Sequence, residues 1–195
     1  MITTLSSVAQ IQTAMVFRTQ PPQEDFNGNV RALAIRNLVA NVPPHWSTLP
    51  RVTVDNKCLT HCLRDGDIVI PSRGDYYVAW LFEGADEPVF PLGQLNVIRT
   101  AASLSPQYLV WYLNQKTTQT KISQLLTGSS IQALTKASLL TIPIEVPSLM
   151  KQNEISELDS TTKRILALRH RLNELDKAET AFLTKKCLEA GDIHD

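Results

Sequence analysis

The sequence lacks several features that would place it in a specialised class of protein. No stretch approaches the roughly 18 uninterrupted apolar residues of a membrane-spanning helix. Residues 1–12 have no basic segment leading into an apolar one, as an export signal would. Cysteine is scarce, and an odd total of three does not describe a disulfide framework but is typical of a reducing compartment. We therefore expect a cytoplasmic protein that does not contact a membrane.

An excess of charge of one sign is also missing. Lys and Arg number 19 and Asp and Glu number 19, so the net charge is zero. Residues 1–150 carry 11 basic and 10 acidic side chains, and residues 151–195 carry 8 and 9. This balance argues against tight, non-specific coating of nucleic acid, which needs many phosphate-neutralising cations. A local basic face remains possible.

Motifs that carry catalysis are absent or incomplete. The run Asn41–Trp46 weakly resembles the Pro-Pro-aromatic loop of DNA amino-methyltransferases, but Val42 and His45 occupy the places of its polar and aromatic residues. No Gly-rich turn is present to hold S-adenosylmethionine. Gly128–Ser130 lacks the lysine of a nucleotide-binding loop, and no Gly-x-Ser-x-Gly hydrolase frame occurs. The sequence therefore predicts a chain without catalytic residues and without a cofactor of its own.

Two clusters of metal-binding residue types have simpler interpretations. Cys58, His61 and Cys62 lack the second pair of ligands that a structural zinc site needs. In an extended strand, the two cysteines would face one side and the histidine the other. Asp65 and Asp67 belong to a turn sequence, and no Glu-x-Lys follows them as a metal-dependent nuclease would require. We predict core cysteines, turn carboxylates and no metal site.

Residues 1–148, which we call the head, have the pattern of a β-rich globular domain. Short apolar runs alternate with turn residues. Extended segments are expected at Val30–Leu38, Arg51–Leu63, Ile68–Ile70, Tyr76–Phe82 and Val89–Ile98. Ser105 and Pro106 then form an N-cap and first-turn pair for a helix that continues to about Leu126.

Residues 149–190, which we call the arm, predict one long helix with an apolar seam at heptad spacing. The seam is interrupted only by Thr161 and Glu179, and its interface residues are Leu158, Ile165, Leu168, Leu172, Leu175 and Phe182. One helix cannot bury such a seam by itself, so the arm needs a partner. The expected fold class is α+β: a β-rich head, a long C-terminal coiled-coil-forming helix, and a flexible tail at residues 191–195.

Several short motifs follow one another in a specific order. They are V-A-Q-I-Q-T-A-M-V-F at Val8–Phe17, G-D-I-V-I-P-S-R-G at Gly66–Gly74, P-x-Y-L at Pro106–Leu109, a Gly loop with a short helix and an Ile-Pro strand in Gly128–Pro147, and Q-x-x-I at Gln152–Ile155. In this order they resemble the target recognition domain and the start of the long helix in type I restriction-modification specificity (S) subunits. Ala14 stands where that family usually has Gly.

The resemblance implies a non-catalytic subunit whose head reads one DNA half-site. The long helices of the family form an antiparallel coiled coil that sets the distance between half-sites and docks methyltransferase (M) subunits. The implied partners are double-stranded DNA, M subunits and, as a further candidate, the restriction (R) subunit. S-adenosylmethionine, ATP and Mg are then expected only on partner subunits.

Full-length members of that family carry two recognition domains and two long helices, whereas this sequence has one of each. It therefore corresponds to half an S subunit. The resemblance leaves two forms open: a half-length protein that forms a homodimer through the arm, or one half of a longer chain.

For DNA readout we select polar side chains in or beside expected loops and strand ends. Arg, Lys, Asn and Gln can reach base edges, and cations and hydroxyls bind phosphates. Arg73 and the loop that ends at Gln132 rank highest. The predicted DNA-binding residues are Arg18, Gln20, Arg36, Asn37, Arg73, Tyr76, Gln94, Lys116, Ser129, Ser130, Gln132 and Lys136.

Two other functions are weighed against this hypothesis. In the first, the chain is a dimeric protein-interaction adaptor without DNA contact, and the zero net charge favours it slightly. In the second, the chain is an enzyme in its own right, which the missing motifs disfavour. A DNA affinity that falls with added salt would separate DNA recognition from the adaptor function.

Overall fold

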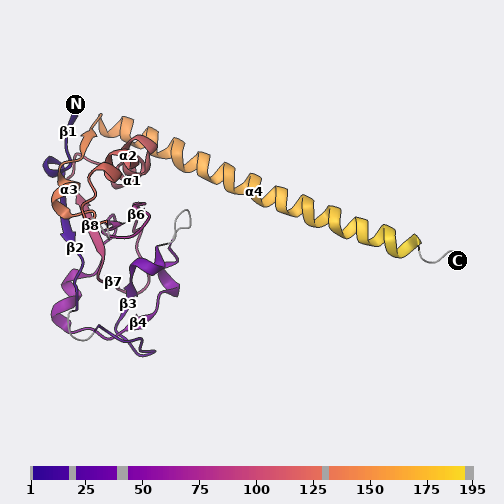
Figure 1. Cartoon of the computed structure of the whole chain (residues 1–195), viewed down its shortest axis with the longest axis horizontal. Helices are drawn as coiled ribbons and strands as arrows, with labels where there is room; N and C mark the ends of the chain where they lie inside the picture. The colour runs from indigo at the N-terminus through magenta and orange to yellow at the C-terminus, as the bar shows by residue number, and fades with distance from the viewer. Residues whose placement is uncertain (1, 18–20, 39–43, 129–131, 192–195) are drawn as a thin grey trace. The chain divides into compact units, whose positions relative to one another are not determined.

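The computed structural model describes residues 2–17, 21–38, 44–128 and 132–191, the side chains of 189–191 aside. It forms two compact units, Met1–Asn153 and Glu154–Asp195. The elements in chain order are β1 (Ile2–Thr4), β2 (Ala9–Thr13), β3 (Val30–Leu33), β4 (Arg51–Val52), β5 (Ile68–Pro71), β6 (Trp80–Leu81), β7 (Val89–Pro91), β8 (Leu95–Thr100), α1 (Pro106–Asn114), α2 (Lys116–Gln124), α3 (Lys136–Leu140), β9 (Pro143–Glu145) and α4 (Leu149–Gly191) (Figure 1). The expected α+β class is confirmed.

The described residues of the head form three small sheets. The largest has the strand order β2-β8-β5-β6, a second has the order β4-β3-β7 with β3 and β7 parallel, and β1 pairs with β9. All four residues of β5 are buried, as are the first four of β8. Strands buried on both faces are continuously apolar, which is why these runs do not alternate in the sequence.

The core lies on both sides of β3. Leu33 packs in a cluster with Val69, Phe82 and Leu95, whereas Val30 and its neighbours pack against Phe90. Alternate residues of a strand face opposite sides, so β3 joins the two clusters.

The expected extended segment Arg51–Leu63 is wrong beyond Val52. Residues Asn56–His61 form a 3-10 helix instead. Cys58 and Cys62 lie half-buried against the Phe90 cluster, as expected of core cysteines, and burial raises the pKa of the Cys62 thiol. Cys58, His61 and Cys62 therefore do not lie on the two faces of a strand. Within the described ranges, no group of three or more His, Cys, Asp or Glu could hold a metal ion.

Three other expected segments are interrupted. Val30–Leu38 is a strand only to Leu33, and Ile35–Asn37 form a 3-10 helix. Of Tyr76–Phe82, only β6 pairs in a sheet. The Asn114 side chain bonds both the N–H and the carbonyl of Ala79, each at 2.8 Å, in place of a neighbouring strand. Val89–Ile98 bends at Gly93, whose φ of 66° is in the left-handed region that favours glycine, and its two strands enter different sheets.

The helix expected to run from Pro106 to about Leu126 breaks at Gln115. That residue is extended (φ −64°, ψ 140°) and separates α1 from α2. Side chains satisfy carbonyls at the end of α1: Gln119 donates to Leu113 O at 2.8 Å, and Gln115 donates to Trp111 O at 3.2 Å. The N-cap is as expected, since the Ser105 hydroxyl accepts from Tyr108 N.

The arm is one continuous helix through the described part of α4 (Figure 1). Residues 192–195 of the expected tail lie outside the described residues. Across the parts of the chain that the structure describes, no helix is both long enough and apolar enough to cross a membrane.

Candidate nucleic-acid interface

The turn after β5 presents Arg73 at the surface. Its backbone is held from two sides, because Ser72 N–H donates to Gln94 O and the Ser72 carbonyl accepts from Leu134 N–H, both at 2.9 Å. Arg73 also forms an isolated β-bridge with Ala133. The side chain of Arg73 is exposed. An exposed cationic side chain thus projects from a hydrogen-bonded turn.

Gly74 gives this turn a left-handed backbone conformation beside the 3-10 helix Ile35–Asn37. Its φ of 105° is in the left-handed region, where a side chain would be strained. A Cβ at Gly74 would lie 3.6 Å from the Ile35 side chain. The structure therefore brings the Arg73 turn next to the loop that carries Arg36 and Asn37.

Arg36 and Asn37 differ in how far they are available to a ligand. The Asn37 side-chain carbonyl accepts Ala34 N–H at 2.9 Å, so it holds the loop together. Arg36 forms a 2.9 Å ion pair with Glu24, and both side chains are more than two-thirds exposed. An ion pair this exposed is weak. The guanidinium of Arg36 can therefore release the carboxylate of Glu24 and bind a phosphate instead.

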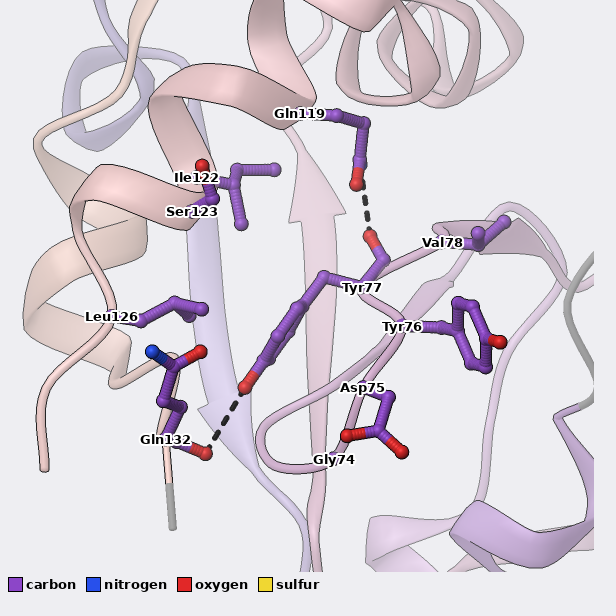
Figure 2. A pocket seen from close by; sticks show the side chains of 10 residues that line it. All are labelled: Gly74, Asp75, Tyr76, Tyr77, Val78, Gln119, Ile122, Ser123, Leu126 and Gln132. Carbon is purple, nitrogen blue, oxygen red and sulfur yellow. Dashed lines mark hydrogen bonds between the residues drawn. The ribbon is translucent and has the colours of Figure 1, made fainter. Parts of the chain in front are cut away.

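A pocket of about 670 Å³ opens beside the same turn. Its lining comes from the turn and the segment after it, from α2, and from Gln132; the residues are Gly74, Asp75, Tyr76, Tyr77, Val78, Gln119, Ile122, Ser123, Leu126 and Gln132 (Figure 2). Ile122 and Leu126 are apolar, while Asp75, Gln119 and Ser123 bring polar groups. The pocket can therefore take a group with an apolar face and a polar edge.

Tyr77 spans this pocket and fixes it. Its hydroxyl donates to Gln132 O at 3.0 Å, and its backbone carbonyl accepts from Gln119 Nε2 at 3.0 Å (Figure 2). Burial, followed by the nearby Asp75 carboxylate, raises the pKa of Tyr77. Tyr76 points the other way in Figure 2 and is 64% exposed. Tyr77 is thus structural, and Tyr76 is the tyrosine available to a ligand.

The predicted DNA-binding residues fall into three groups. Arg73, Tyr76, Gln94 and Gln132 meet around the Arg73 turn, with Arg36 and Asn37 beside them. Lys116 does not line the pocket, and Lys136 lines another one, beside β2 and β8. The remaining predictions, Arg18, Gln20, Ser129 and Ser130, lie outside the described residues.

Sequence reasoning missed Phe26, Asp75 and two residues of α2, Gln119 and Ser123. Phe26 is 87% exposed, and its position in a loop rich in Pro, Asn and Gly was an available signal. The sequence gave no such signal for Gln119 and Ser123. The break at Gln115 sets the direction of α2, and this break was not predicted.

The Phe26 loop is held by ionic and hydrogen-bonding groups. Asp25 accepts from Asn27 N–H at 2.9 Å and from the Thr53 hydroxyl at 2.7 Å, and these bonds, the Thr53 bond first, lower the pKa of Asp25. Arg51 donates to Phe26 O at 3.2 Å. The exposed ring therefore stands on an ordered backbone.

Glu87 links Arg51 to Arg31. Arg51 donates to both carboxylate oxygens, at 2.9 and 2.6 Å, and Arg31 donates at 3.1 Å. The hydrogen bonds from the two guanidinium groups, that of Arg51 first, lower the pKa of Glu87 to about 2. Both arginines therefore bond Glu87 within the head.

Asp67, in the G-D-I motif, has a structural role. It is 2% exposed. Its carboxylate accepts Arg64 N–H at 2.9 Å, as expected of a turn residue, and two bonds from Arg99 at 2.8 and 2.9 Å. The hydrogen bond with Asp67 raises the pKa of Arg99. The motif thus fixes the start of β5, whose other end leads into the Arg73 turn.

The arm offers a different kind of surface. The six predicted seam residues are 44% to 70% exposed, a large fraction for such apolar side chains. Leu166, Leu183 and Leu188, which lie off the seam, are exposed as well. Exposed apolar side chains in a row indicate an interface.

Residues 2–177 match the family model for the type I restriction modification DNA specificity domain. No curated protein sequence matches this chain. The match covers most of the chain, from β1 into the arm.

Solved structures share the fold. One, reported for complex assembly and conformational transition of the type I R-M system, has a TM-score of 0.69 at 22% identity over 94% of this chain and 43% of that one. The HsdS subunit from Thermoanaerobacter tengcongensis has a TM-score of 0.63 at 20% identity, over 87% and 39% of the two chains. The type I S subunit from M. genitalium has a TM-score of 0.57 at 15% identity, over 91% and 42%. This chain therefore spans about two-fifths of the length of those structures.

Proposed function

The chain belongs to the type I restriction modification DNA specificity domain family, and we propose that it is the non-catalytic DNA-recognition component of a type I restriction-modification complex. In this proposal the head reads one half-site of a DNA target. Methylation and cleavage are carried out by partner chains, which hold S-adenosylmethionine, ATP and Mg.

The observation that carries the proposal is the convergence around the Arg73 turn. Segments from three regions, at residues 35–37, 72–78 and 132–134, meet there and expose polar side chains. Arg73 can donate two hydrogen bonds to guanine O6 and N7, or bind phosphate. Asp75 can accept from cytosine N4, and Gln132 can pair with adenine. One surface therefore presents hydrogen-bonding groups that suit several bases.

Two exposed aromatic rings add contact area to this function. Tyr76 lies three residues after Arg73 in the sequence, and Phe26 lies on a separate loop. Aromatic side chains contact sugars and bases without strong sequence preference. We assign them to affinity, and Arg73 with its polar neighbours to readout.

The arm supplies the second half of the proposal. Its exposed seam fits another long helix, and a coiled coil of two such helices would hold two heads at a set spacing on DNA. The surface of that coil would dock the methyltransferase subunits.

The test is methylation by the assembled complex. The chain is co-expressed with the methyltransferase subunit of its own system, and methylated adenines are mapped by sequencing DNA exposed to the complex. We expect one bipartite motif that disappears when this chain is omitted. A methyltransferase that neither binds this chain nor changes its target would overturn the proposal and favour the adaptor function.

Arg73→Ala tests the head directly. We expect about a tenfold loss of DNA affinity or more, since one bidentate base contact contributes about 1–3 kcal/mol. The matched control is Arg64→Ala, an exposed arginine on the turn before β5 rather than after it. Equal losses for the two variants would exclude a specific role for Arg73.

A further inference from the structure

We propose that the pocket beside the Arg73 turn, which we call the Tyr77 pocket, binds one guanine base that has swung out of the DNA stack. This inference rests on the proposed function of the head in DNA recognition. It adds a binding site for a single base and the identity of that base. The observation that carries it is a pocket of about 670 Å³ that combines an apolar wall with an excess of hydrogen-bond acceptors.

The Tyr77 pocket has the size and the apolar wall that a base requires. Its volume lies within the range of about 300–1,000 Å³ that is usual for small-molecule sites. Ile122, which is 1% exposed, and the half-buried Val78 and Leu126 supply apolar surface from two segments of the chain. Tyr77 joins these segments through the hydrogen bonds of its hydroxyl and its carbonyl (Figure 2). The flat face of a base can therefore be buried against an ordered wall.

The polar groups of this pocket are mostly acceptors. Gln119 uses its side-chain N–H groups on two backbone carbonyls, at 3.0 and 2.8 Å, which leaves its own carbonyl oxygen to accept. Ser123 donates its hydroxyl to a backbone carbonyl of α2 at 2.7 Å, which leaves the lone pairs of its oxygen. The carboxylate of Asp75 makes no hydrogen bond or ion pair with any residue in the described part of the chain. Gln132 brings an amide N–H as a donor.

A carboxylate in this setting selects guanine. Guanine is the DNA base whose Watson–Crick edge carries two neighbouring donors, N1–H and N2–H, and a carboxylate can accept both at once. Cytosine and adenine place an unprotonated ring nitrogen beside their amino group, which a carboxylate repels. Thymine has one donor between two carbonyls. Asp75 therefore fits guanine, and the side-chain amide of Gln132 can donate to guanine O6.

This contact requires a guanine outside the duplex. In a base pair the N1–H is bonded to cytosine, and a carboxylate in the major groove of an intact duplex reaches only the cytosine amino group. A base that swings out exposes its whole edge. Arg73 directly precedes Gly74, the first residue of the lining, so its cation can bind the phosphate of the extruded nucleotide. The same cation opposes a lysine or arginine side chain of another protein as the ligand.

Duplexes with a single bulged base test the pocket in the full-length chain, because an unpaired base costs least to extrude. The probes are a labelled duplex with a bulged guanine, the same duplex with a bulged adenine, and the fully paired duplex. We expect the guanine bulge to bind about tenfold more tightly than the adenine bulge, since one bidentate contact discriminates by about this factor or more. Equal affinity for the two bulges overturns the proposal.

Two substitutions localise the preference. Asp75→Asn presents one acceptor and one donor, which suit adenine, so the preference should shift from the guanine bulge toward the adenine bulge. Ser123→Phe, at an exposed position of α2, fills the pocket and should abolish the preference. The matched control is Gln124→Phe, exposed on the same helix but outside the lining, which should keep it. A guanine preference that survives both pocket substitutions overturns the site.

Calorimetry with guanosine and adenosine monophosphates separates a base in DNA from a free nucleotide. Selective binding of guanosine monophosphate, with no preference between the bulges, would assign the pocket to a free nucleotide and overturn extrusion from DNA. The fully paired duplex reports on the proposed function separately. Salt-dependent binding of this duplex with equal affinity for the bulges rejects the site and leaves DNA recognition standing. A chain that binds none of the three duplexes overturns both.

Discussion

At the scale of single residues, Asp67 is a buried charged group that holds the start of β5. It is 2% exposed and accepts three hydrogen bonds, two of them from Arg99. Asp67→Asn removes the charge and replaces one of the two acceptor oxygens with a donor, so the guanidinium of Arg99 loses its ion pair. We expect a loss of about 3 kcal/mol in the free energy of unfolding, measured by urea denaturation. Asp65→Asn, at an exposed turn position, should change it by less than about 0.5 kcal/mol; similar losses for both would argue against the buried pair.

Glu87 predicts an acid-sensitive contribution to stability. Its pKa is lowered from 4.5 to about 2 in the folded head, chiefly by hydrogen bonds from Arg51 and then Arg31. The folded state therefore holds the proton less tightly than the unfolded chain does. The contribution is complete above pH 4.5 and is lost as the pH falls through 2.

The measurement compares Glu87→Gln with the unchanged chain by denaturation at several pH values. The stability difference between them should be constant at neutral pH and should shrink as the pH falls from 4.5 toward 2. A difference that does not depend on pH would show that the carboxylate charge contributes nothing.

At the scale of elements, Gln152 joins the first turn of α4 to the rest of the head. Its side chain is fully buried, accepts Ser105 N–H at 2.8 Å and donates to Ser103 O at 3.0 Å and Pro147 O at 2.9 Å. Gln152→Leu leaves these backbone groups unsatisfied. We expect a loss of about 2 kcal/mol in unfolding free energy. The control is Gln107→Leu on the exposed side of α1, which should be nearly neutral.

Elements with strong local signals were predicted from the sequence. The Ser105–Pro106 cap starts α1, and the heptad seam belongs to one long helix. Elements set by distant partners were not. The backbone groups of Ala79, just before β6, are bonded by Asn114, which lies 35 residues away in the sequence. Local strand propensity does not predict a contact with a residue so far away in the sequence.

The candidate site shows the same division. Arg73 was ranked highest together with the Gly128–Gln132 loop, and the structure places Arg73 on an exposed, hydrogen-bonded turn. Its proximity to Ile35 and Ala133 could not be predicted, because those contacts join segments from three parts of the chain. Asn37 shows the converse: a residue type suited to base readout whose carbonyl is used to hold its own loop.

At the scale of the whole molecule, the seam predicts assembly that can be removed without unfolding the head. Leu168→Asp or Leu175→Asp places a charge in the apolar interface and should abolish assembly measured by sedimentation. Circular dichroism of the head's aromatic residues should not change. Leu166→Asp is the matched control, since Leu166 is 58% exposed but lies off the seam. Assembly that persists in both seam variants would exclude the seam as the interface.

The pairing of β1 with β9 has a consequence for how such chains change over time. Residues 2–4 lie hydrogen-bonded beside residues 143–145, a few positions before α4 begins. The first and last strands of the head therefore lie side by side, and a foreign domain with the same closing pair could be joined to α4 without stretching the chain. Under the proposed function, recombination at these two strands would exchange the recognition surface in a single step and leave α4 unchanged.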